Sequence, residues 1–376
     1  MSSPVVTPVT SRRQQKQFIQ FPWKHYEGDP MWVPPLLMEH RGLLGYKHHP
    51  FYDYAKIQTF LATRNGQVVG RIAAIVNPAH NERANEQRGF FGFFESIDDQ
   101  QVASALFDAA RDWLFSQGMT SIRGPANPSL NYEIGMLIDG FHSPPCFMMT
   151  YNKPYYGRLI EGWGFQKTQD MFAFWGHVNM VANLDKKLWF IGNEAKERFK
   201  VVTRPMDAKN FRNEVEMFLR VYNASLVGTW GFAPLSAGEI KQLAAGLKQL
   251  IAPELALVAE IDGKPIGACL GLLDYNPRIK AINGRLFPFG FLKLITNKRA
   301  IQKMRVISIN VIPEYQRWGL GVVLLGALIE PMIKWGIQEV EFSWVLESNT
   351  LSRSSLEKGG AKLDKTYRMY DYDPPA

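Results

Sequence analysis

The sequence has little of what several classes of protein require. Its 376 residues include only two cysteines, Cys146 and Cys269, which lie far apart in the chain. Two distant cysteines provide neither a disulfide framework nor a thiolate metal cluster, and they favour a reducing, cytoplasmic environment. The seven histidines show no spacing typical of metal ligands, and no Ser-His-Asp pattern stands out. We therefore expect no metal.

Long apolar runs and clustered charge are also missing. No window reaches the roughly 18 uninterrupted apolar residues of a membrane span. Residues 1–16 contain no apolar core of signal-peptide length, and their Pro, Ser and Thr content predicts a flexible tail. The net charge of +8 is spread along the chain, and no basic run is interleaved with aromatics. We expect no nucleic acid partner, whereas an anionic ligand or a peripheral membrane contact would suit this charge.

Two pairs of similar segments indicate an internal duplication. "NGQVVG" begins at Asn65 and "DGKPIG" at Asp262. Both read as a tight hairpin turn followed by a strand with a second glycine. "LIEGWGFQKTQDMFAFW" begins at Leu159 and "SLEKGGAKLDKTYRMYDY" at Ser355, each a helix end followed by an aromatic strand. The nearly constant offset predicts two domains, residues 17–178 and 195–376, joined by a linker at 179–194.

The second copy gives the clearer order of elements. Helical periodicity begins at Phe211, and a second helix follows a capping box formed by Ser236 and Glu239. A hairpin, a strand, a long apolar helix, a strand, a short helix and a last strand complete it. This order predicts an α+β fold with a mixed, mostly antiparallel sheet flanked by helices in each copy, arranged as a pseudo-dimer within one chain.

A glycine-rich loop separates the motif strand from the long helix. It reads "QRWGLG", residues 316–321. Glycines at a helix N-terminus let a ligand approach free N–H groups, the helix dipole adds partial positive charge, and Arg317 adds a full one. Together these features favour phosphate binding. The alternative is a turn that needs its glycines for geometry alone.

This loop resembles the acyl-CoA-binding motif of the GNAT acyltransferase superfamily, Gln/Arg-x-x-Gly-x-Gly/Ala after a strand. "VLESNTLSRSSLEKGGAK" resembles the next motif, with Asn349, Glu357, Lys358 and Gly360 in register, Ser352 in place of an alanine and Ala361 in place of a phenylalanine. The resemblance covers nearly all of the second copy and, more faintly, the first.

The resemblance implies an N-acyltransferase that passes an acyl group, first of all acetyl, from acetyl-CoA or another acyl-CoA to a small-molecule or lipid-like amine. The alternatives are a non-catalytic CoA- or metabolite-binding protein and a long-chain acyltransferase acting on a lipid-like amine. The implied cofactor-binding residues are Val311, Ile312, Gln316, Arg317, Trp318, Gly319, Leu320, Gly321 and Asn349.

The chain departs from the superfamily pattern at the proton-transfer residues. Leu356 stands at the position of the superfamily's usual general-acid tyrosine. Tyr367 or Tyr370 either substitutes for that tyrosine or only packs in the core. The motif strand carries no carboxylate. We therefore take Ser308 and Asn310 as the candidate catalytic residues, holding a water that relays a proton; ordinary hydrogen bonding is the alternative.

Two further regions are candidates for substrate contact. Trp230 and Phe232 lie in the loop after the first helix of the second copy and would contact the acceptor or anchor the core. Residues 283–299 combine phenylalanines with basic flanks, which fits a lid, a membrane contact or apolar surface buried between the copies. In the first copy, Asp98 and Asp99 replace the loop glycines and would repel a pyrophosphate, so we expect one CoA site, in the second copy.

Overall fold

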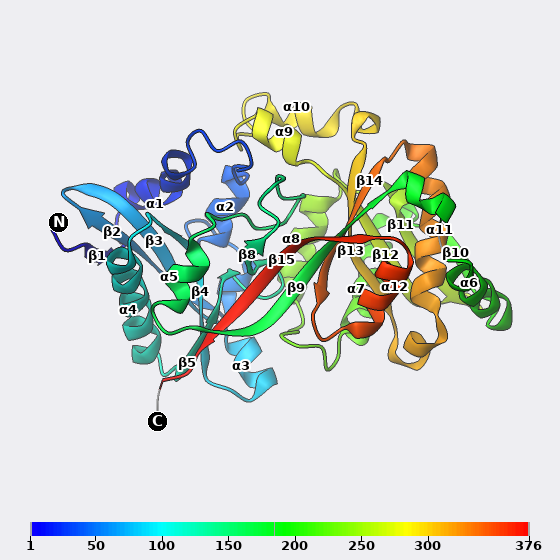
Figure 1. Ribbon diagram of the computed structural model, residues 1–376, viewed down its shortest axis with the longest axis horizontal. Helices are drawn as coiled ribbons and strands as arrows, with labels where there is room; N and C mark the ends of the chain where they lie inside the picture. The colour runs from blue at the N-terminus through cyan, green and yellow to red at the C-terminus, as the bar shows by residue number, and fades with distance from the viewer. Residues whose placement is uncertain (1, 184, 375–376) are drawn as a thin grey trace. The chain divides into compact units, whose positions relative to one another are not determined.

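The protein folds into two compact units, described here from a computed structural model that places residues 2–183 and 185–374 (Figure 1). The first unit comprises Met1–Asp170, Ile279–Gly290 and Thr366–Ala376. The second comprises Met171–Arg278 and Phe291–Lys365. The ranges predicted from the sequence follow the repeat along the chain, whereas these units follow the segments that pack together.

The first unit is a mixed sheet flanked by helices. Its sheet order is β1-β2-β3-β4-β5-β15, with β8 also paired to β15, and all of these neighbours are antiparallel except β4 and β5. The strands are β1 Val5–Pro8, β2 Lys56–Arg64, β3 Gln67–Val76, β4 Arg88–Ser96, β5 Ser121–Gly124, β6 Ala126–Asn127, β7 Glu133–Ile134 and β8 Met136–Asp139. The helices are α1 Arg12–His25, α2 Leu37–Leu43, η1 Pro50–Asp53, α3 Pro78–Ala84, α4 Gln100–Ser116 and α5 Tyr156–Glu161.

The second unit repeats this architecture. Its sheet order is β10-β11-β12-β13-β14-β9, antiparallel except for β13 and β14. The strands are β10 Val202–Pro205, β11 Ala256–Ile261, β12 Lys264–Leu273, β13 Lys303–Val311 and β14 Glu339–Leu346. The helices are η2 Val178–Asn183, α6 Lys186–Arg198, η3 Ala208–Asn210, α7 Phe211–Ser225, α8 Ala237–Leu247, η4 Pro253–Leu255, η5 Lys298–Ala300, η6 Pro313–Trp318, α11 Leu320–Trp335 and α12 Thr350–Lys358.

Four elements contain a boundary between the units: α9 Asn276–Ala281, α10 Gly290–Ile295, β9 Gln166–His177 and β15 Lys362–Tyr372. The last strand of each sheet comes from the other half of the sequence. β9 ends the first copy but pairs with β14, and β15 ends the second copy but pairs with β5. The two copies have therefore exchanged their final strands.

The local signals of the repeat are confirmed. Both hairpin turns have positive φ at their two central residues, 51° and 74° at Asn65-Gly66 and 49° and 72° at Asp262-Gly263. Ser236 and Glu239 form the predicted capping box of α8. The α+β fold with mostly antiparallel sheets is also as predicted.

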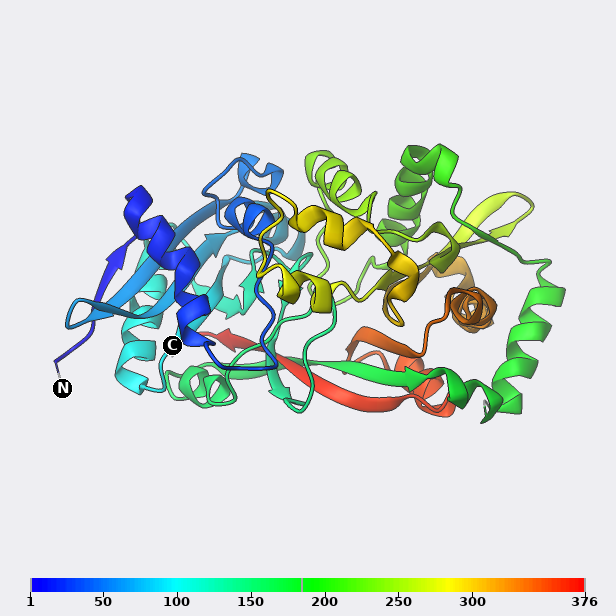
Figure 2. The same ribbon diagram turned by 90° about the horizontal axis from the view of Figure 1, so that it is seen from above.

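Helices cover both faces of the second sheet. On one face, Met217 and Val221 of α7 pack with Ala268 of β12. On the opposite face, α11 approaches β12 and β13, with Leu324 next to Gly267 and Gly321 next to Ile309. Helix α6, which begins in the predicted linker (179–194) and ends beyond it, lies beside α11 (Figure 2). The loop predicted to bind phosphate is thus fixed at the start of α11, between the sheet and α6.

Candidate active site

The two parallel strands at the centre of the second sheet separate part of the way along. Pairing between β13 and β14 runs from Lys303–Glu339 to Val306–Phe342, and the described strands form no later pair. The amide of Ile312 donates to Ile266 O of β12 at 3.0 Å. Because backbone groups alternate in direction along a strand, Ile309 and Val311 direct theirs to the opened side. The Val311 amide therefore faces the opened side, where an extended ligand could pair with it, whereas the Ile312 amide is already bonded.

The predicted loop forms the N-terminus of a helix, where Leu320 is buried and Gly321 is partly exposed. Gly319 has φ +79° and is the N-cap of α11. The amides of Val322 and Val323 donate to Gly319 O at 2.9 and 3.2 Å. Those of Leu320 and Gly321, the first of the helix, have no acceptor within it. This arrangement fits a diphosphate group.

The side chains of the loop have separate roles. Arg317 is exposed and forms no ion pair with a described residue, so its charge is available to an anion. Gln316 instead bonds within the protein: its Nε2 donates to Val311 O at 3.0 Å and to Ser225 O at 2.9 Å. Trp318 stacks on Phe199 with ring centroids 4.0 Å apart. Gln316 and Trp318 therefore fix the position of the loop.

The two loop glycines tolerate different substitutions. A Cβ at Gly319 would lie 2.9 Å from Ile191 Cγ2 of α6, in addition to requiring a left-handed backbone. A Cβ at Gly321 would meet only Ile309 Cγ2, at 4.0 Å. Gly319 is thus required by the fold, whereas the space beside Gly321 is open for a ligand.

Gly319→Ala is accordingly expected to destabilise the protein by about 1–3 kcal/mol, because a non-glycine residue in this backbone region is strained and its methyl group contacts Ile191. Thermal or urea unfolding measures this effect. Gly321→Ala is the matched control and should unfold close to the wild type. Equal stability of the two variants would contradict the packing described here.

A bulge gathers polar residues on one face of β13. The register of β12 and β13 shifts between Leu270 and Gly271, so that β13 carries one extra residue, Ile307. Arg305, Ser308 and Asn310 pair with alternate residues of β12 and therefore share a face. This is the face that α7 covers, opposite to α11. The bulge keeps a charged and two polar side chains together in an otherwise apolar strand.

The structure brings the two candidate catalytic residues together. The Asn310 amide nitrogen donates to Ser308 Oγ, and Asn310 Oδ1 accepts from Ser225 Oγ of α7 at 3.0 Å. Asn310 is buried and Ser308 is half-buried. Ser308 keeps its own proton and further lone pairs, so this pair can still bind a water.

A buried polar cluster at the base of the opening was missed from the sequence. Arg305, 2% exposed, donates to Ser343 Oγ at 2.8 Å and to Ser343 O at 3.1 Å. Ser343 Oγ donates in turn to Glu341 Oε1 at 2.6 Å. The sequence signal that could have indicated this cluster was a charged residue, Arg305 or Glu341, inside each of two largely apolar strands. The cluster links β13 to β14 where their pairing ends.

The remaining predicted site residues, Asn349, Trp230 and Phe232, lie at the start of α12 and in the loop after α7. Asn349 is the N-cap of α12, where its Oδ1 accepts from Ser352 N at 3.1 Å. Phe232 packs edge-on against Tyr222 of α7, with centroids 6.0 Å apart. Phe232 and Trp230 are half-buried in the loop after α7. Their loop thus follows the helix that also carries Ser225.

Leu356 and the two tyrosines considered as substitute proton donors are all buried. Leu356 packs with Phe174 and Val345 in an apolar cluster of the second unit. Tyr367 and Tyr370 are fully buried in the first unit, where the Tyr370 hydroxyl donates to Glu161 Oε1 at 3.1 Å. Both tyrosines therefore pack, as the alternative interpretation had it.

The first copy has no comparable phosphate loop. Asp99 is the N-cap of α4, where its Oδ1 accepts from the amides of Gln101 and Val102, and its Oδ2 accepts from Arg64 at 2.7 Å. Hydrogen bonding by Arg64 lowers the pKa of the Asp99 carboxyl, which keeps it charged. Asp98 pairs with Arg158 instead. A carboxylate thus occupies the helix end that a phosphate would need.

The first copy also fills the opening between its parallel strands. The β4–β5 pairing ends at Phe90–Arg123. Beyond it, the Phe93 amide donates to Asn127 Oδ1 at 2.7 Å, and a Cβ at Gly92 would lie 1.9 Å from Ala126 O. The protein's own chain therefore lies where the second copy has an open strand edge.

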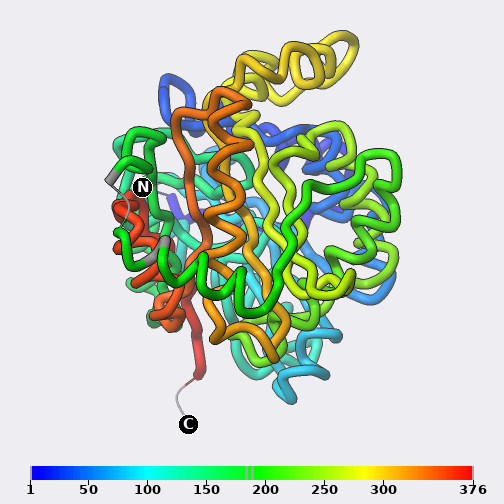
Figure 3. The backbone as a smooth tube through the Cα atoms, turned by 90° about the vertical axis from the view of Figure 1, so that its right-hand side faces the viewer, coloured from blue at the N-terminus to red at the C-terminus, as the bar shows by residue number. Residues whose placement is uncertain are grey.

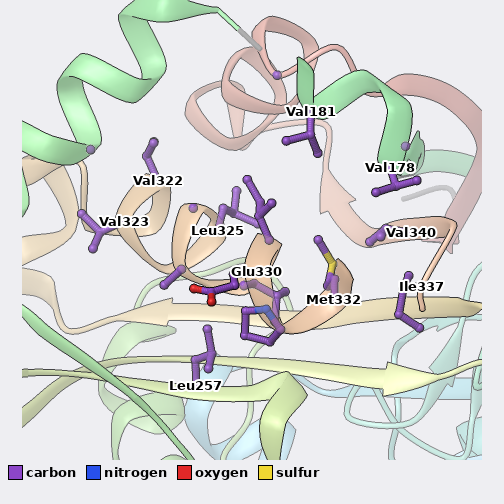
Figure 4. A pocket seen from close by; sticks show the side chains of 18 of the residues that line it. Val178, Val181, Leu257, Val322, Val323, Leu325, Glu330, Met332, Ile337 and Val340 are labelled. Atoms are coloured by element: carbon purple, nitrogen blue, oxygen red, sulfur yellow. The ribbon is translucent and has the colours of Figure 1, made fainter. Parts of the chain in front are cut away.

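An apolar cavity of about 530 Å³ lies along α11 in the second unit (Figure 4). It extends from the first turn of this helix to the start of β14, and Gly192 of α6 is part of its wall. Apolar side chains predominate in the lining, among them Val178, Val181, Val322, Leu325, Met332 and Val340. Lys196, Lys334 and His177 are among its polar lining residues. On α11 the cavity lining begins at Val322, directly after the loop at 316–321. The cavity suits an alkyl chain better than a polar group.

No group of three or more His, Cys, Asp or Glu residues within residues 2–183 and 185–374 is placed to hold a metal ion. No helix among the described residues is long and apolar enough to traverse a bilayer. Both cysteines are buried.

Comparison with known proteins places these features in a family. The model of the "Acetyltransferase (GNAT) family" matches residues 215–360. The chain is 36% identical to "Protein YghO" of Escherichia coli (strain K12) over 375 residues, covering 98% of this chain and 95% of that protein. It is 34% identical to the "Bacterial ceramide synthase" of Caulobacter vibrioides over 378 residues, covering 97% and 96%.

A solved structure shows a similar fold. The tandem GNAT protein from the clavulanic acid biosynthesis pathway superposes with a TM-score of 0.55, at 12% identity and with 99% of each chain covered. At that identity the likeness concerns the fold alone. With the two full-length relatives, it establishes that the chain belongs to the GNAT superfamily of acyltransferases and contains two tandem GNAT-like domains.

Proposed function

We propose that the protein is an acyl-CoA-dependent N-acyltransferase that transfers a long acyl chain to a lipid-like amine, with catalysis in the second copy. One observation carries this proposal. Pairing between β13 and β14 ends at Val306, close to the glycines at the N-terminus of α11. One opening thus offers a strand edge to the pantetheine arm and helix amides to the diphosphate.

Each part of the opening has a defined task in this proposal. The Gly321 amide, with the Arg317 side chain, holds the diphosphate. The Val311 amide, on the opened side of β13, holds the pantetheine arm and aims the thioester. Asn349, at the start of α12, would contact the same arm through its side-chain amide.

The reaction is a direct attack of the amine on the thioester. A water held by Ser308 and Asn310 takes the proton of the ammonium group, and the neutral amine attacks the carbonyl carbon. A C–N bond forms, the C–S bond breaks, and CoA leaves as the thiolate; the nitrogen gives its extra proton to water, and the thiolate takes one from water, which leaves an amide and free CoA. Because Leu356 supplies no proton, this last step depends on the acidity of the CoA thiol itself.

The apolar cavity and one relative favour a long acyl chain over acetyl. The cavity volume lies within the roughly 300–1,000 Å³ of ligand pockets, and apolar side chains predominate in its lining. The Caulobacter relative is named a ceramide synthase, and a ceramide is a sphingoid base whose amine carries a long acyl chain. Trp230 and Phe232, beside α7, would contact the apolar part of such an acceptor.

A non-catalytic CoA-binding protein is the second candidate. It is favoured by the lack of a carboxylate on β13 and of a hydroxyl at Leu356. A thiol-release assay with acyl-CoAs of increasing chain length and a panel of amines separates the two. We expect release of free CoA that requires both a long-chain donor and a lipid-like amine. CoA binding without release under any pairing would refute the enzyme.

Filling the cavity should shift the preferred chain length. Ala327 lines the cavity on α11, and Ala327→Phe adds a ring inside it. Because each buried methylene contributes about 0.8 kcal/mol, losing room for two or three should lower kcat/KM for the longest donors about tenfold or more and spare short ones. Ala245→Phe, on the exposed side of α8, is the matched control. An unchanged chain-length profile in Ala327→Phe would remove the cavity from the proposal.

A further inference from the structure

One exposed segment, residues 283–299, is unusual in both apolar and charged content. It holds Phe287, Phe289 and Phe291 together with basic residues, and it includes α10. No Asp or Glu occurs in the chain between Asp274 and Glu314. The segment is therefore both aromatic and uniformly basic.

The aromatic side chains are exposed rather than buried. Phe287 and Phe289 are 72% and 73% exposed, and Phe291, Leu292 and Ile295 are 38%, 42% and 38% exposed. Single exposed apolar side chains are common, but five within nine residues form a patch. Such a patch indicates contact with another apolar phase.

The segment is held firmly at its base. In the second unit, Arg278 donates to the carbonyl oxygens of Lys293, Thr296 and Asn297 at 2.9, 2.5 and 2.6 Å, and Leu294 is buried. Figures 1 and 3 show α10 (yellow) apart from that unit's strands. In the first unit, Trp23 Nε1 donates to Asn283 Oδ1 at 2.7 Å, and the Leu37 amide donates to Gly284 O at 3.0 Å. The exposed phenylalanines thus extend from a fixed backbone.

The charges next to the phenylalanines are available to a ligand. Arg285 and Lys293 are exposed and pair with no acidic side chain among the described residues. The other two cations are engaged: Lys298 donates to Gln249 O, and Arg299 pairs with Glu254 at 3.3 Å and lies over the Trp335 ring. The available positive charges, Arg285 and Lys293, therefore flank the exposed phenylalanines in the sequence.

We propose that residues 283–299 dock the protein on the surface of an anionic lipid bilayer. Phe287 and Phe289 enter the boundary between headgroups and acyl chains, and Arg285 and Lys293 contact the lipid phosphates. Apolar insertion with flanking cations is the chemistry of peripheral membrane contact, whereas the buried centre of a protein interface is depleted of lysine. This surface stands independently of the catalytic proposal, although it would bring the enzyme to a lipid-like acceptor.

Co-sedimentation with vesicles tests the proposal without any substrate. Vesicles of phosphatidylcholine alone are compared with vesicles of phosphatidylcholine and phosphatidylglycerol. The full-length protein should sediment with the anionic vesicles and should be released by high salt. Phe287→Ser with Phe289→Ser should lower partitioning about tenfold or more. Arg285→Ala with Lys293→Ala should lower it about tenfold on anionic vesicles only.

Phe190→Ser is the matched control, because Phe190 on α6 is 64% exposed and outside the segment. It should sediment like the wild type, and all variants should share the wild-type melting temperature. Three results would overturn the proposal: wild-type protein that stays with the supernatant, a Phe287/Phe289 variant that sediments normally, or an equal loss in Phe190→Ser. A variant that sediments normally but changes chain-length preference would make the segment a lid. Because no acyl-CoA is present, failure here is distinct from failure of the proposed reaction.

Discussion

Gly321→Glu is expected to weaken acyl-CoA binding by about 100-fold or more while leaving the fold intact. A Cβ at Gly321 meets no atom closer than 4.0 Å, so the side chain has room. Its carboxylate would then lie at the helix N-terminus where we propose that the diphosphate binds, and like charges placed together cost several kcal/mol. Each 1.4 kcal/mol corresponds to about a tenfold change in affinity. Isothermal titration with CoA measures this loss directly.

Gly321→Ala is the control for this variant, because it adds the Cβ without the charge. It should bind CoA within about threefold of the wild type, a difference below 1 kcal/mol. Both variants should melt close to the wild type, in contrast to Gly319→Ala. The wild type should show one CoA site per chain, since Asp99 and the filled opening exclude a site in the first copy. Two sites per chain, or normal affinity in a folded Gly321→Glu protein, would contradict the assignment of the loop.

Asn310→Ala is expected to lower kcat/KM by about 10²-fold, within the range of general acid–base contributions, with little change in CoA affinity. Its side chain orients the Ser308 hydroxyl and, in the proposal, the water that accepts the ammonium proton. In the proposal, β13 contacts the cofactor through its backbone, so binding should persist. Steady-state kinetics combined with CoA titration separates the two effects.

Two further variants control for structure. Ser225→Ala removes the hydroxyl that donates to Asn310 Oδ1 but leaves the bond from Asn310 to Ser308, so its kinetic loss should be smaller. Glu341→Gln perturbs the buried cluster at the base of the opening without touching Asn310. Normal kinetics in Asn310→Ala would remove it from the mechanism. Complete loss of turnover in a folded Glu341→Gln protein would instead point to a carboxylate as the base.

Features set by neighbouring residues were predictable from the sequence. The Asn65-Gly66 and Asp262-Gly263 turns, the Ser236–Glu239 capping box and the loop at 316–321 each depend on a few adjacent residues whose backbone preferences are strong. These signals were enough to recognise the repeat and the fold.

Features set by distant residues were not predictable. The exchange of β9 and β15 depends on which sheet edge each strand meets, and either sheet offers an equivalent position. The packing of α6 on Gly319 depends on Ile191, which is remote in sequence. The bonds from Gln316 Nε2 to Val311 O and Ser225 O likewise required the fold, since the motif indicated only a phosphate contact by the loop's backbone amides.

The measurement that tests the central claim most directly is identification of the product. Purified protein is incubated with a long-chain acyl-CoA and a sphingoid base whose nitrogen is isotopically labelled, and free thiol and labelled amide are quantified together by mass spectrometry. The account predicts one N-acyl product for each CoA released, and loss of both in Gly321→Glu. Free CoA without an amide, or a CoA-bound protein that releases none with any amine, would contradict it.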